Sequence, residues 1–416
     1  MEKTSLPTRD LQVERGQRLI ADVRVPVSLL KEPERFGQHR EGDCVRGDLL
    51  IDQGRAVALT ASQPGSDPRM LMPALVEAHC HLDKCHSLPR LGAVGGDLAA
   101  ALTAQRQDKV HWTSEDLRHR MSLGMGELVA AGCNTARSHI DWGDQTTPPR
   151  AWSVVHEIAA DHPELTFQAA ALTAITHLAS HETCFETAKH IAAYPGGVLG
   201  SFVLHHDARD IKAGLANAFA AADRFGLPLD FHVDEGLGAN NGLEAICDAA
   251  IETQFEGPIL CGHAVSLMDR NGTDLKRLIN KLLRAKIAIC ALPTSNLYLQ
   301  GRQRGTPDRR GITRLRELHA AGVPIVIGSD NVADAFCPLG QHDPRAALHL
   351  AALAGHLDPP MGQWLPAITL NPAGAMGLNV PYVDDTPLEN LRLCAVSHTS
   401  DLVAGRRALT SLDTVP

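Results

Sequence analysis

The sequence predicts an α/β protein: a (β/α)8 TIM barrel with a small β-sandwich domain formed by both chain termini. From about residue 97 to 357, short apolar or β-branched runs alternate with longer amphipathic stretches, which is typical of βα units around a parallel sheet. Eight runs are candidate strands, the number that closes such a barrel. A barrel takes about 250 residues, so a chain of 416 residues also has room for a second domain. We expect the barrel over residues 71–379 and the small domain over 1–70 plus 380–416.

The barrel elements can be assigned in chain order. The candidate strands are Ala74–Ala78, Asn134–Ser138, Thr166–Leu172, Val198–Leu204, Pro228–Phe231, Pro258–Gly262, Ile287–Leu292 and Pro324–Gly328. One helix between them is Ser114–Ala131, whose apolar residues form a single stripe and whose start Thr113 can cap. Another is Asp274–Lys286, where leucines face inward and a basic face is interpreted as solvated surface.

The two ends of the chain contain further β-type segments. Val45–Leu59 predicts two short strands around a tight turn at Asp52–Gly54, and Leu391–Val403 contributes more β-type residues. These segments lie on opposite sides of the barrel region in the sequence. We therefore expect the chain ends to pair into one small β domain beside the barrel.

Composition excludes several classes of protein. Hydrophobic residues make up 44% and charged residues 21%, as in ordinary globular proteins. A net charge of −9 lacks the basic footprint of a nucleic-acid binder, and no apolar run reaches the length of about 18 residues that predicts a membrane span. The ten cysteines contain no C-x-x-C pair and the amino terminus is polar. We expect a cytoplasmic protein with reduced thiols, and the sequence leaves a homo-oligomer open.

Histidine is over-represented, with 21 residues against nine Phe, four Trp and three Tyr. His79 and His81 follow an apolar strand, where residues two apart point to the same face. His232 and His263 end two other candidate strands, and Asp330 ends the eighth. These positions share the carboxyl face of the barrel, where barrel enzymes build their active sites.

Three imidazoles and a carboxylate at such positions predict a metal site. His79, His81, His232 and Asp330 have donor atoms that suit one divalent ion, zinc or ferrous iron, with an open position for water. Glu235, three residues after His232, adds a carboxyl group that can transfer protons. The sequence therefore predicts metal-assisted hydrolysis.

The motifs resemble the amidohydrolase superfamily, and in particular its cytosine deaminase-like branch. The similar stretches are His79-Cys80-His81-Leu82-Asp83, His232-Val-Asp-Glu235, His263, Leu299-Gln300-Gly301-Arg302, Arg309-Arg310-Gly311-Ile312-Thr313-Arg314 and Gly328-Ser-Asp-Asn331. The resemblance covers roughly residues 71 to 378. It implies a (β/α)8 barrel with a small β-sandwich built from both chain ends, which agrees with the fold predicted above.

The resemblance also implies a role for each site residue. His79, His81, His232 and Asp330 would be the metal ligands, Glu235 the proton shuttle, and His263 the hydrogen-bonding partner of the attacking hydroxide. Members with two metals use a lysine at the end of strand four, and Val198–Arg209 contains none. The resemblance therefore implies a single metal and a reaction in which water attacks a ring carbon and ammonia leaves.

Some positions depart from the cytosine deaminase pattern. Ala174 stands where that branch has a glutamine that binds the pyrimidine edge, which favours a different substrate. Asn331 and Phe336 replace an aspartate and a tryptophan. Lys84 is similar to a lysine of the triazine-ring amidohydrolases. It either contacts a ring carbonyl or an anionic substituent of the substrate, or forms an ion pair with a carboxylate such as Asp83 or Asp141.

Three functions remain as hypotheses. The first is a metal-dependent deaminase of a small N-heterocycle, cytosine-like or with a related ring amidine. The second is an amidohydrolase that removes an N-alkyl amine from a triazine-like ring or opens a cyclic amide. The third, a non-catalytic metal-binding barrel, is disfavoured because metal binding alone would require neither Glu235 nor His263.

Overall fold

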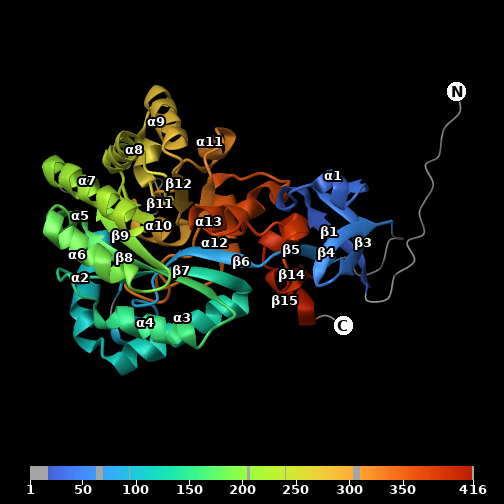
Figure 1. Ribbon diagram of the computed structural model, residues 1–416, viewed down its shortest axis with the longest axis horizontal. Coiled ribbons are helices and arrows are strands. Elements are labelled where there is room, and N and C mark those ends of the chain that lie inside the picture. The colour runs from blue at the N-terminus through green and yellow to red at the C-terminus, as the bar shows by residue number, and fades with distance from the viewer. Residues whose placement is uncertain are drawn as a thin grey trace, which may run out of the picture.

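Eight parallel strands form one sheet that curves into a nearly closed barrel, which confirms the predicted fold class (Figure 1). The computed structural model describes residues 17–61, 69–92, 94–203, 207–238, 240–302 and 310–414. Two parts of the motifs above, residues 204–206 and Arg309, lie outside these ranges. The first and last strands approach each other where Cys80 and Asp330 form a parallel bridge.

Each barrel strand overlaps one predicted strand. The strands are β6 (Leu75–Cys80), β7 (Cys133–Asp141), β8 (Thr166–Ala174), β9 (Gly197–Val203), β10 (Leu229–Val233), β11 (Ile259–His263), β12 (Ala288–Ala291) and β13 (Ile325–Ile327). In the sheet they keep their sequence order from β6 to β13. His79 and His263 lie within the ends of their strands, His81 comes directly after β6, and Asp330 comes three residues after β13.

Helices surround the barrel and connect its strands. They are α2 (Leu98–Asp108), α3 (Ser114–Ala131), α4 (Arg150–Ala160), α5 (Ile175–Leu178), α6 (His181–Ala192), α7 (Ala208–Phe225), α8 (Gly242–Thr253), α9 (Gly272–Arg284), α10 (Pro293–Leu299), α11 (Leu315–Ala320), α12 (Pro344–Gly355) and α13 (Leu370–Ala375). Helix α3 has the predicted bounds, because the Thr113 hydroxyl accepts a hydrogen bond from Asp116 N at 3.1 Å and Gly132 ends the helix at φ 101°. Helix α9 begins two residues earlier than predicted, because Asn271 caps it.

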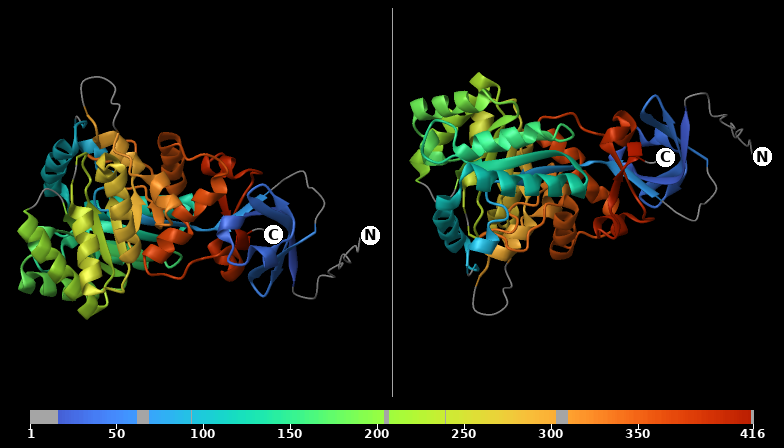
Figure 2. Two further views of the ribbon diagram at one scale, coloured as in Figure 1. Left: turned by 90° about the horizontal axis from the view of Figure 1, so that it is seen from above. Right: turned by 90° about the horizontal axis from the view of Figure 1, so that it is seen from below.

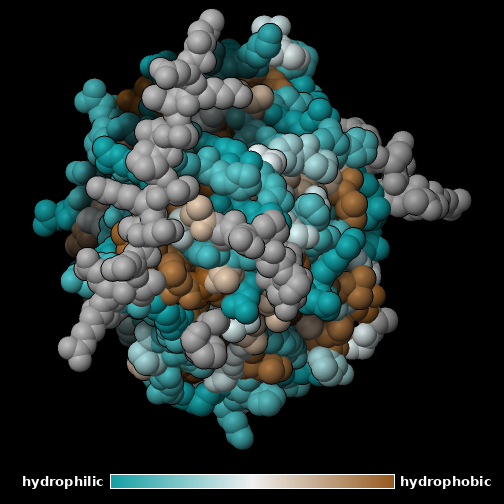
Figure 3. All heavy atoms as spheres, turned by 90° about the vertical axis from the view of Figure 1, so that its right-hand side faces the viewer, coloured by the Kyte–Doolittle hydropathy of each residue, from teal (hydrophilic) through white to brown (hydrophobic). Residues whose placement is uncertain are grey.

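Both chain ends build a second sheet, as predicted. Its strands are β1 (Arg18–Pro26), β2 (Arg40–Glu41), β3 (Cys44–Asp52), β4 (Arg55–Thr60), β5 (Arg69–Pro73), β14 (Leu391–Cys394) and β15 (Leu409–Ser411). Strand β14 pairs antiparallel with β5, which joins the carboxyl-terminal segment to the amino-terminal one. This sheet lies at one end of the molecule, beside the barrel (Figure 2). On the visible part of this end face, hydrophobic side chains form separate patches among hydrophilic ones (Figure 3).

One expectation for the second domain was too broad. Within the predicted β-type segment 391–403, only β14 is a strand, and Thr399–Val403 forms the short helix α14. Thr399, Leu402 and Val403 are spaced three and four residues apart and are all buried, so this segment packs one helical face.

The barrel interior is closed at the end where the strands begin. Met376, directly after α13, packs with Val76, Leu260 and Val326 inside the barrel. The opposite end, where the strands finish, is therefore the accessible one. Among the helices within the described ranges, none has the length and apolar character that a membrane crossing requires.

Candidate active site

A cavity of about 440 Å³ opens at the end of the barrel where the strands finish. All four residues predicted to contact a substrate line it, namely Lys84, Ala174, Asn331 and Phe336. The predicted metal ligands His81, His232 and Asp330 and the predicted proton-transfer residues Glu235 and His263 also line it. The structure thus places residues from five barrel strands or the loops after them around one space.

The predicted metal ligands lie together below this cavity. His81 Nε2 is 3.2 Å from Asp330 Oδ1 and 3.2 Å from His232 Nε2, and His79 Nε2 is 3.6 Å from Asp330 Oδ1. His79 completes the set from the same face of β6 as His81, at a ring separation of 4.5 Å from His232. Donor atoms within 4.8 Å of one another form two overlapping groups that share His79: one with His81, His139 and His232, the other with His263 and Asp330.

Several of these donor atoms are buried and have no hydrogen-bond partner. They include His79 Nε2, His263 Nε2 and Asp330 Oδ1. Buried polar atoms are nearly always paired in folded proteins, so an unpaired set converging on one point indicates a ligand that completes it. Neutral imidazoles and a carboxylate are the donors that a divalent zinc or iron ion prefers. The residues present therefore fit a divalent metal.

The protonation states of the cluster agree with this donor role. Burial lowers the pKa of His79 and also lowers that of His81, to about 3, so both imidazoles are neutral. Burial alone would raise the pKa of Asp330, but the adjacent imidazoles of His81 and His263 hold it at about 2. Ser295 also donates a hydrogen bond to Asp330 Oδ2. Asp330 is therefore a carboxylate at neutral pH.

His263 and Glu235 face each other across the cluster. His263 Nδ1 donates to Asn296 Oδ1 at 3.0 Å, and because an amide oxygen only accepts, the lone pair of His263 is on Nε2. That nitrogen is 3.9 Å from Glu235 Oε2. Burial raises the pKa of Glu235 above its ordinary value, which favours the protonated acid. The pair thus places an imidazole nitrogen beside a carboxyl group whose pKa is raised.

The loop that carries Glu235 is fixed by Asp234. Its carboxylate accepts hydrogen bonds from Gly242 N at 3.0 Å and Leu243 N at 3.3 Å, at the start of α8, and from Ser266 Oγ at 2.8 Å. Asp234 has φ 49°, the left-handed conformation that non-glycine residues seldom adopt. His263 at φ 69° and Asp330 at φ 62° share this conformation at the ends of their strands. Such positions cluster at active sites, where surrounding contacts hold them in place.

Lys84 forms the ion pair that was one of its two predicted interpretations. Its Nζ is 2.9 Å from Asp141 Oδ1, and it donates to His81 Nδ1 at 3.0 Å. Although burial opposes the charge, Asp141 and Asp83 raise the pKa of Lys84 above its ordinary value. Asp141 also accepts from Gln105 at 2.5 Å and pairs with Lys109 at 2.9 Å. Lys84 still lines the cavity.

Sequence reasoning missed the helix that borders the cavity. Helix α2 contributes Leu98, Leu102, Gln105 and Arg106 to the lining. Two of these residues, Leu98 and Leu102, pack against a small apolar cluster that contains Phe336. The signal that pointed to it is the cap Asp97, whose carboxylate accepts from Ala100 N at 3.0 Å.

A second polar layer lies deeper in the barrel and was also missed. Arg137 on β7 donates to Asp230 Oδ2 at 2.7 Å and to Gln168 Oε1 at 2.7 and 3.0 Å. His139, two residues further along β7, has Nε2 2.9 Å from Asp230 Oδ1 and its ring 4.0 Å from that of His79. The signal in the sequence is Asp230, a carboxylate between Leu229 and Phe231 in a fully buried strand.

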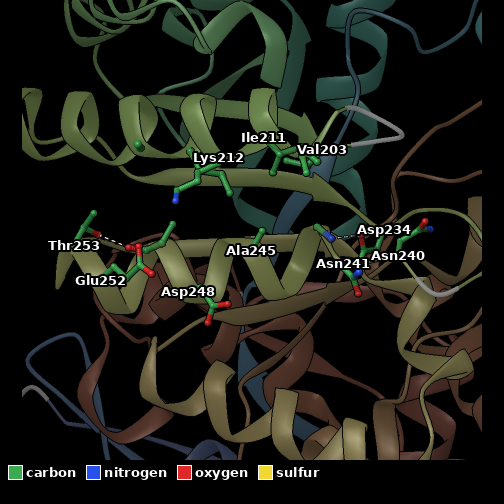
Figure 4. Close-up of a pocket in the computed structure, with 15 residues that line it drawn as sticks. Val203, Ile211, Lys212, Asp234, Asn240, Asn241, Ala245, Asp248, Glu252 and Thr253 are labelled. Carbon is green, nitrogen blue, oxygen red and sulfur yellow. Dashed lines mark hydrogen bonds between the residues drawn. The ribbon is translucent and has the colours of Figure 1, made fainter.

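A larger hollow, about 600 Å³, lies outside the barrel between α7 and α8. Figure 4 shows Lys212 pointing from α7 towards α8, with Asp248 and Glu252 on α8. None of the predicted metal ligands or proton-transfer residues lines it. The predicted site residues therefore gather at the smaller cavity and not at this hollow.

Comparison with known proteins gives consistent matches. Residues 90–381 match the family model described as "Amidohydrolase family". The chain is 33% identical over 349 residues to a pterin deaminase of Rhizobium rhizogenes, covering 81% of this chain and 78% of that protein.

The structure of 5-methylcytosine deaminase from Klebsiella pneumoniae with phosphonocytosine has a TM-score of 0.77 at 22% identity, covering 94% of this chain and 95% of that one. N-isopropylammelide isopropylaminohydrolase from Burkholderia multivorans has a TM-score of 0.71 at 19% identity, covering 94% and 97%. At these identities the two solved structures share the fold.

Proposed function

We propose that this chain, which belongs to the amidohydrolase family, is a metal-dependent hydrolytic deaminase of a small N-heterocycle. Water would replace an exocyclic amine on a ring amidine carbon, and ammonia would leave. The observation that carries the proposal is the convergence of unpaired donor atoms of His79, His263 and Asp330 beside Glu235, whose pKa is raised by burial. A barrel that only bound a metal would not need the last group.

His79, His81, His232 and Asp330 would hold one divalent ion, zinc or ferrous iron. When bound at an open position, such an ion lowers the pKa of water from about 15.7 towards 7 and polarises the substrate. The buried, neutral imidazoles and the ionised Asp330 are the forms that coordinate a cation. This donor set supports the proposed ion without distinguishing zinc from iron.

Proton transfer would be divided between three side chains. Nε2 of His263 accepts a hydrogen bond from the attacking water and holds it in line with the ring carbon, while Asp330 Oδ1 takes up its proton. Glu235 donates its proton to a ring nitrogen, which makes the adjacent carbon electrophilic. It then takes up the proton of the newly added hydroxyl and passes it to the leaving amine, and the proton held by Asp330 returns to Glu235 at the end of turnover. The raised pKa of Glu235 supports the first of these transfers, because the acid form must be present when the substrate binds.

The substrate that the cavity supports best is a fused ring larger than a pyrimidine. Ala174 occupies the wall where a glutamine would otherwise bind the pyrimidine edge, and a volume of about 440 Å³ is ample for a bicyclic ring. Phe336 provides an apolar face, while Lys84 and Asn331 provide polar groups at the wall. With the 33% identity to a pterin deaminase, these features favour a pterin-type 2-amino-4-oxo ring.

A screen for released ammonia tests this proposal. The metal-loaded protein is incubated with pterin, cytosine, isocytosine, 5-methylcytosine, creatinine and N-alkyl ammelides, and products are identified by mass spectrometry. We expect ammonia together with the intact oxo ring, with pterin turned over at least tenfold more efficiently than cytosine. Release of an alkylamine, or a ring-opened product, would support the alternative amidohydrolase reactions instead. A metal-loaded protein that turns over none of these compounds would contradict the proposal.

A further inference from the structure

A third group of metal-capable side chains lies away from the cavity. It consists of His86 in the loop after β6, Glu127 on α3 and His342 two residues before α12. His86 Nε2 is 3.0 Å and His342 Nδ1 is 2.9 Å from the same carboxylate oxygen, Glu127 Oε2. None of the three residues lines the 440 Å³ cavity.

The donor atoms have the types and spacing of a metal site. All three lie within 4.8 Å of one another. A zinc ion binds imidazole nitrogen at about 2.0–2.1 Å and carboxylate oxygen at about 2.0–2.2 Å, which places neighbouring ligand atoms roughly 3 Å apart. Two imidazoles with one carboxylate are a recognised zinc set, whereas calcium and magnesium prefer sites made of oxygen. Transition-metal ions therefore suit this group.

The surroundings hold the three side chains in place. His86 has φ 56°, a strained conformation for a residue with a side chain, and its N–H donates to Val332 O at 3.2 Å. The ring of His342 packs on Gly124 of α3, where an added Cβ would come within 2.9 Å of His342 Cε1. A glycine inside a helix lowers the stability of that helix. At position 124 the absence of a side chain leaves room for the imidazole of His342, which points at Glu127.

The charge states also suit coordination. Burial lowers the pKa of His342, which keeps the imidazole neutral at neutral pH. The hydrogen bond from His342 lowers the pKa of Glu127, which keeps that group ionised. The Glu127 side chain is 39% exposed, so water can reach the group and supply a further ligand.

We propose that His86, Glu127 and His342 bind a second divalent transition-metal ion, with water completing the coordination. The three ligands come from separate segments: the loop that also carries His81 and Lys84, helix α3, and the segment that follows Asp330. An ion at this position would cross-link these segments behind the active site. Its role would be structural, since none of its ligands reaches the cavity.

Metal stoichiometry tests the proposal. Chelator-treated protein is titrated with Zn²⁺ against a competing indicator, and bound zinc is measured after gel filtration. We expect the wild type to hold one equivalent more than Glu127→Gln and His86→Asn. Glu127→Gln keeps the size of the side chain and His86 is partly exposed, so both variants should fold. The matched control is Glu164→Gln, which removes a carboxylate 2.9 Å from a single imidazole, His162 Nδ1, and should leave the stoichiometry at the wild-type value.

The difference in zinc stoichiometry between the wild type and Glu127→Gln does not depend on the proposed catalytic metal. In a His79→Ala background, which weakens only the proposed catalytic site, Glu127→Gln should still remove one equivalent. Equal stoichiometry in the wild type and Glu127→Gln would overturn the second site and leave the proposed function untouched. The position is checked by anomalous diffraction at the zinc edge from crystals soaked in zinc chloride. Besides a peak at the proposed catalytic site, a peak between these three side chains is expected, and a map without it would contradict the assignment.

Discussion

Two polar layers occupy the inside of the barrel, and they differ in how their charges are satisfied. In the deeper layer, the guanidinium of Arg137 is matched by Asp230 and Gln168 at 2.7–3.0 Å. In the layer at the strand ends, buried atoms of His79, His263 and Asp330 have no partner. Both layers cost desolvation energy when the chain folds. The Arg137 guanidinium of the deeper layer is satisfied by the protein itself. The unpaired atoms of the outer layer converge on one point, where a ligand can complete them.

The difference separates residues that support the fold from those that perform chemistry. A buried ion pair loses stability when one partner is removed, because the other is left uncompensated. A residue of the outer layer contributes mainly to binding and proton transfer, so its removal should affect turnover more than stability. Three measurements can break or sharpen this distinction.

Glu235→Gln should give the largest effect, on activity alone. The amide cannot donate the proton of a carboxylic acid, so we expect kcat to fall about 10²–10⁴-fold. Glu235 is buried and its charge is disfavoured there, so the variant should unfold at a temperature equal to or above that of the wild type. Ammonia release and thermal melts of the same metal-loaded samples check both statements. Turnover within threefold of the wild type would remove Glu235 from the mechanism.

Arg137→Met should reverse this pattern and act on stability. It leaves Asp230 buried without its guanidinium partner, and we expect the free energy of unfolding to fall by about 3–5 kcal/mol. Urea denaturation of the metal-free protein measures it. The double variant Arg137→Met/Asp230→Leu removes both charges and should recover most of the loss. If the single variant is as stable as the wild type, the deeper layer does not support the fold in the way described.

The smallest effect should come from Glu77, which lies two residues before His79 on β6. It should appear in the pH dependence of the free energy of unfolding. Burial raises its pKa from 4.5 to about 7, against opposing hydrogen bonds from Ser329 and His79. The folded protein therefore binds this proton more tightly than the unfolded chain does. The stability that Glu77 contributes is complete below pH 4.5 and is lost as the pH rises to about 7, an effect of at most roughly 3 kcal/mol.

Urea denaturation of the metal-free protein across this pH range checks that prediction. Glu77→Gln carries no titrating group and should flatten the decline between pH 4.5 and 7. The deeper layer offers the control: the double variant Arg137→Met/Asp230→Leu removes a carboxyl whose lowered pKa places its titration below this range, so it should keep the wild-type slope. An unchanged slope in Glu77→Gln would mean that the carboxyl is ionised in the folded state throughout the range.

The fold and the ring of site residues could be predicted because both depend on local patterns. Alternation of strands and helices specifies parallel βα units, and in such units the carboxyl ends of all strands meet at one face. The sequence alone therefore predicted that four residues meet at this face, namely His79, His232, His263 and Asp330. The family resemblance drawn from these motifs is confirmed. The cap at Thr113 was predictable for the same reason, since its partner lies three residues away.

The rest depended on contacts between residues far apart in the chain. Three examples join segments 41 to 215 residues apart: Lys84 pairs with Asp141, Arg137 pairs with Asp230, and His86 and His342 both contact Glu127. Periodicity carries no information about such pairs, because it records only which face a residue occupies. The sequence by itself determined which side chains face the active end of the barrel. Only the tertiary structure decided which of them are paired within the protein and which are left free for a ligand, because pairing depends on distances that the folded chain alone establishes.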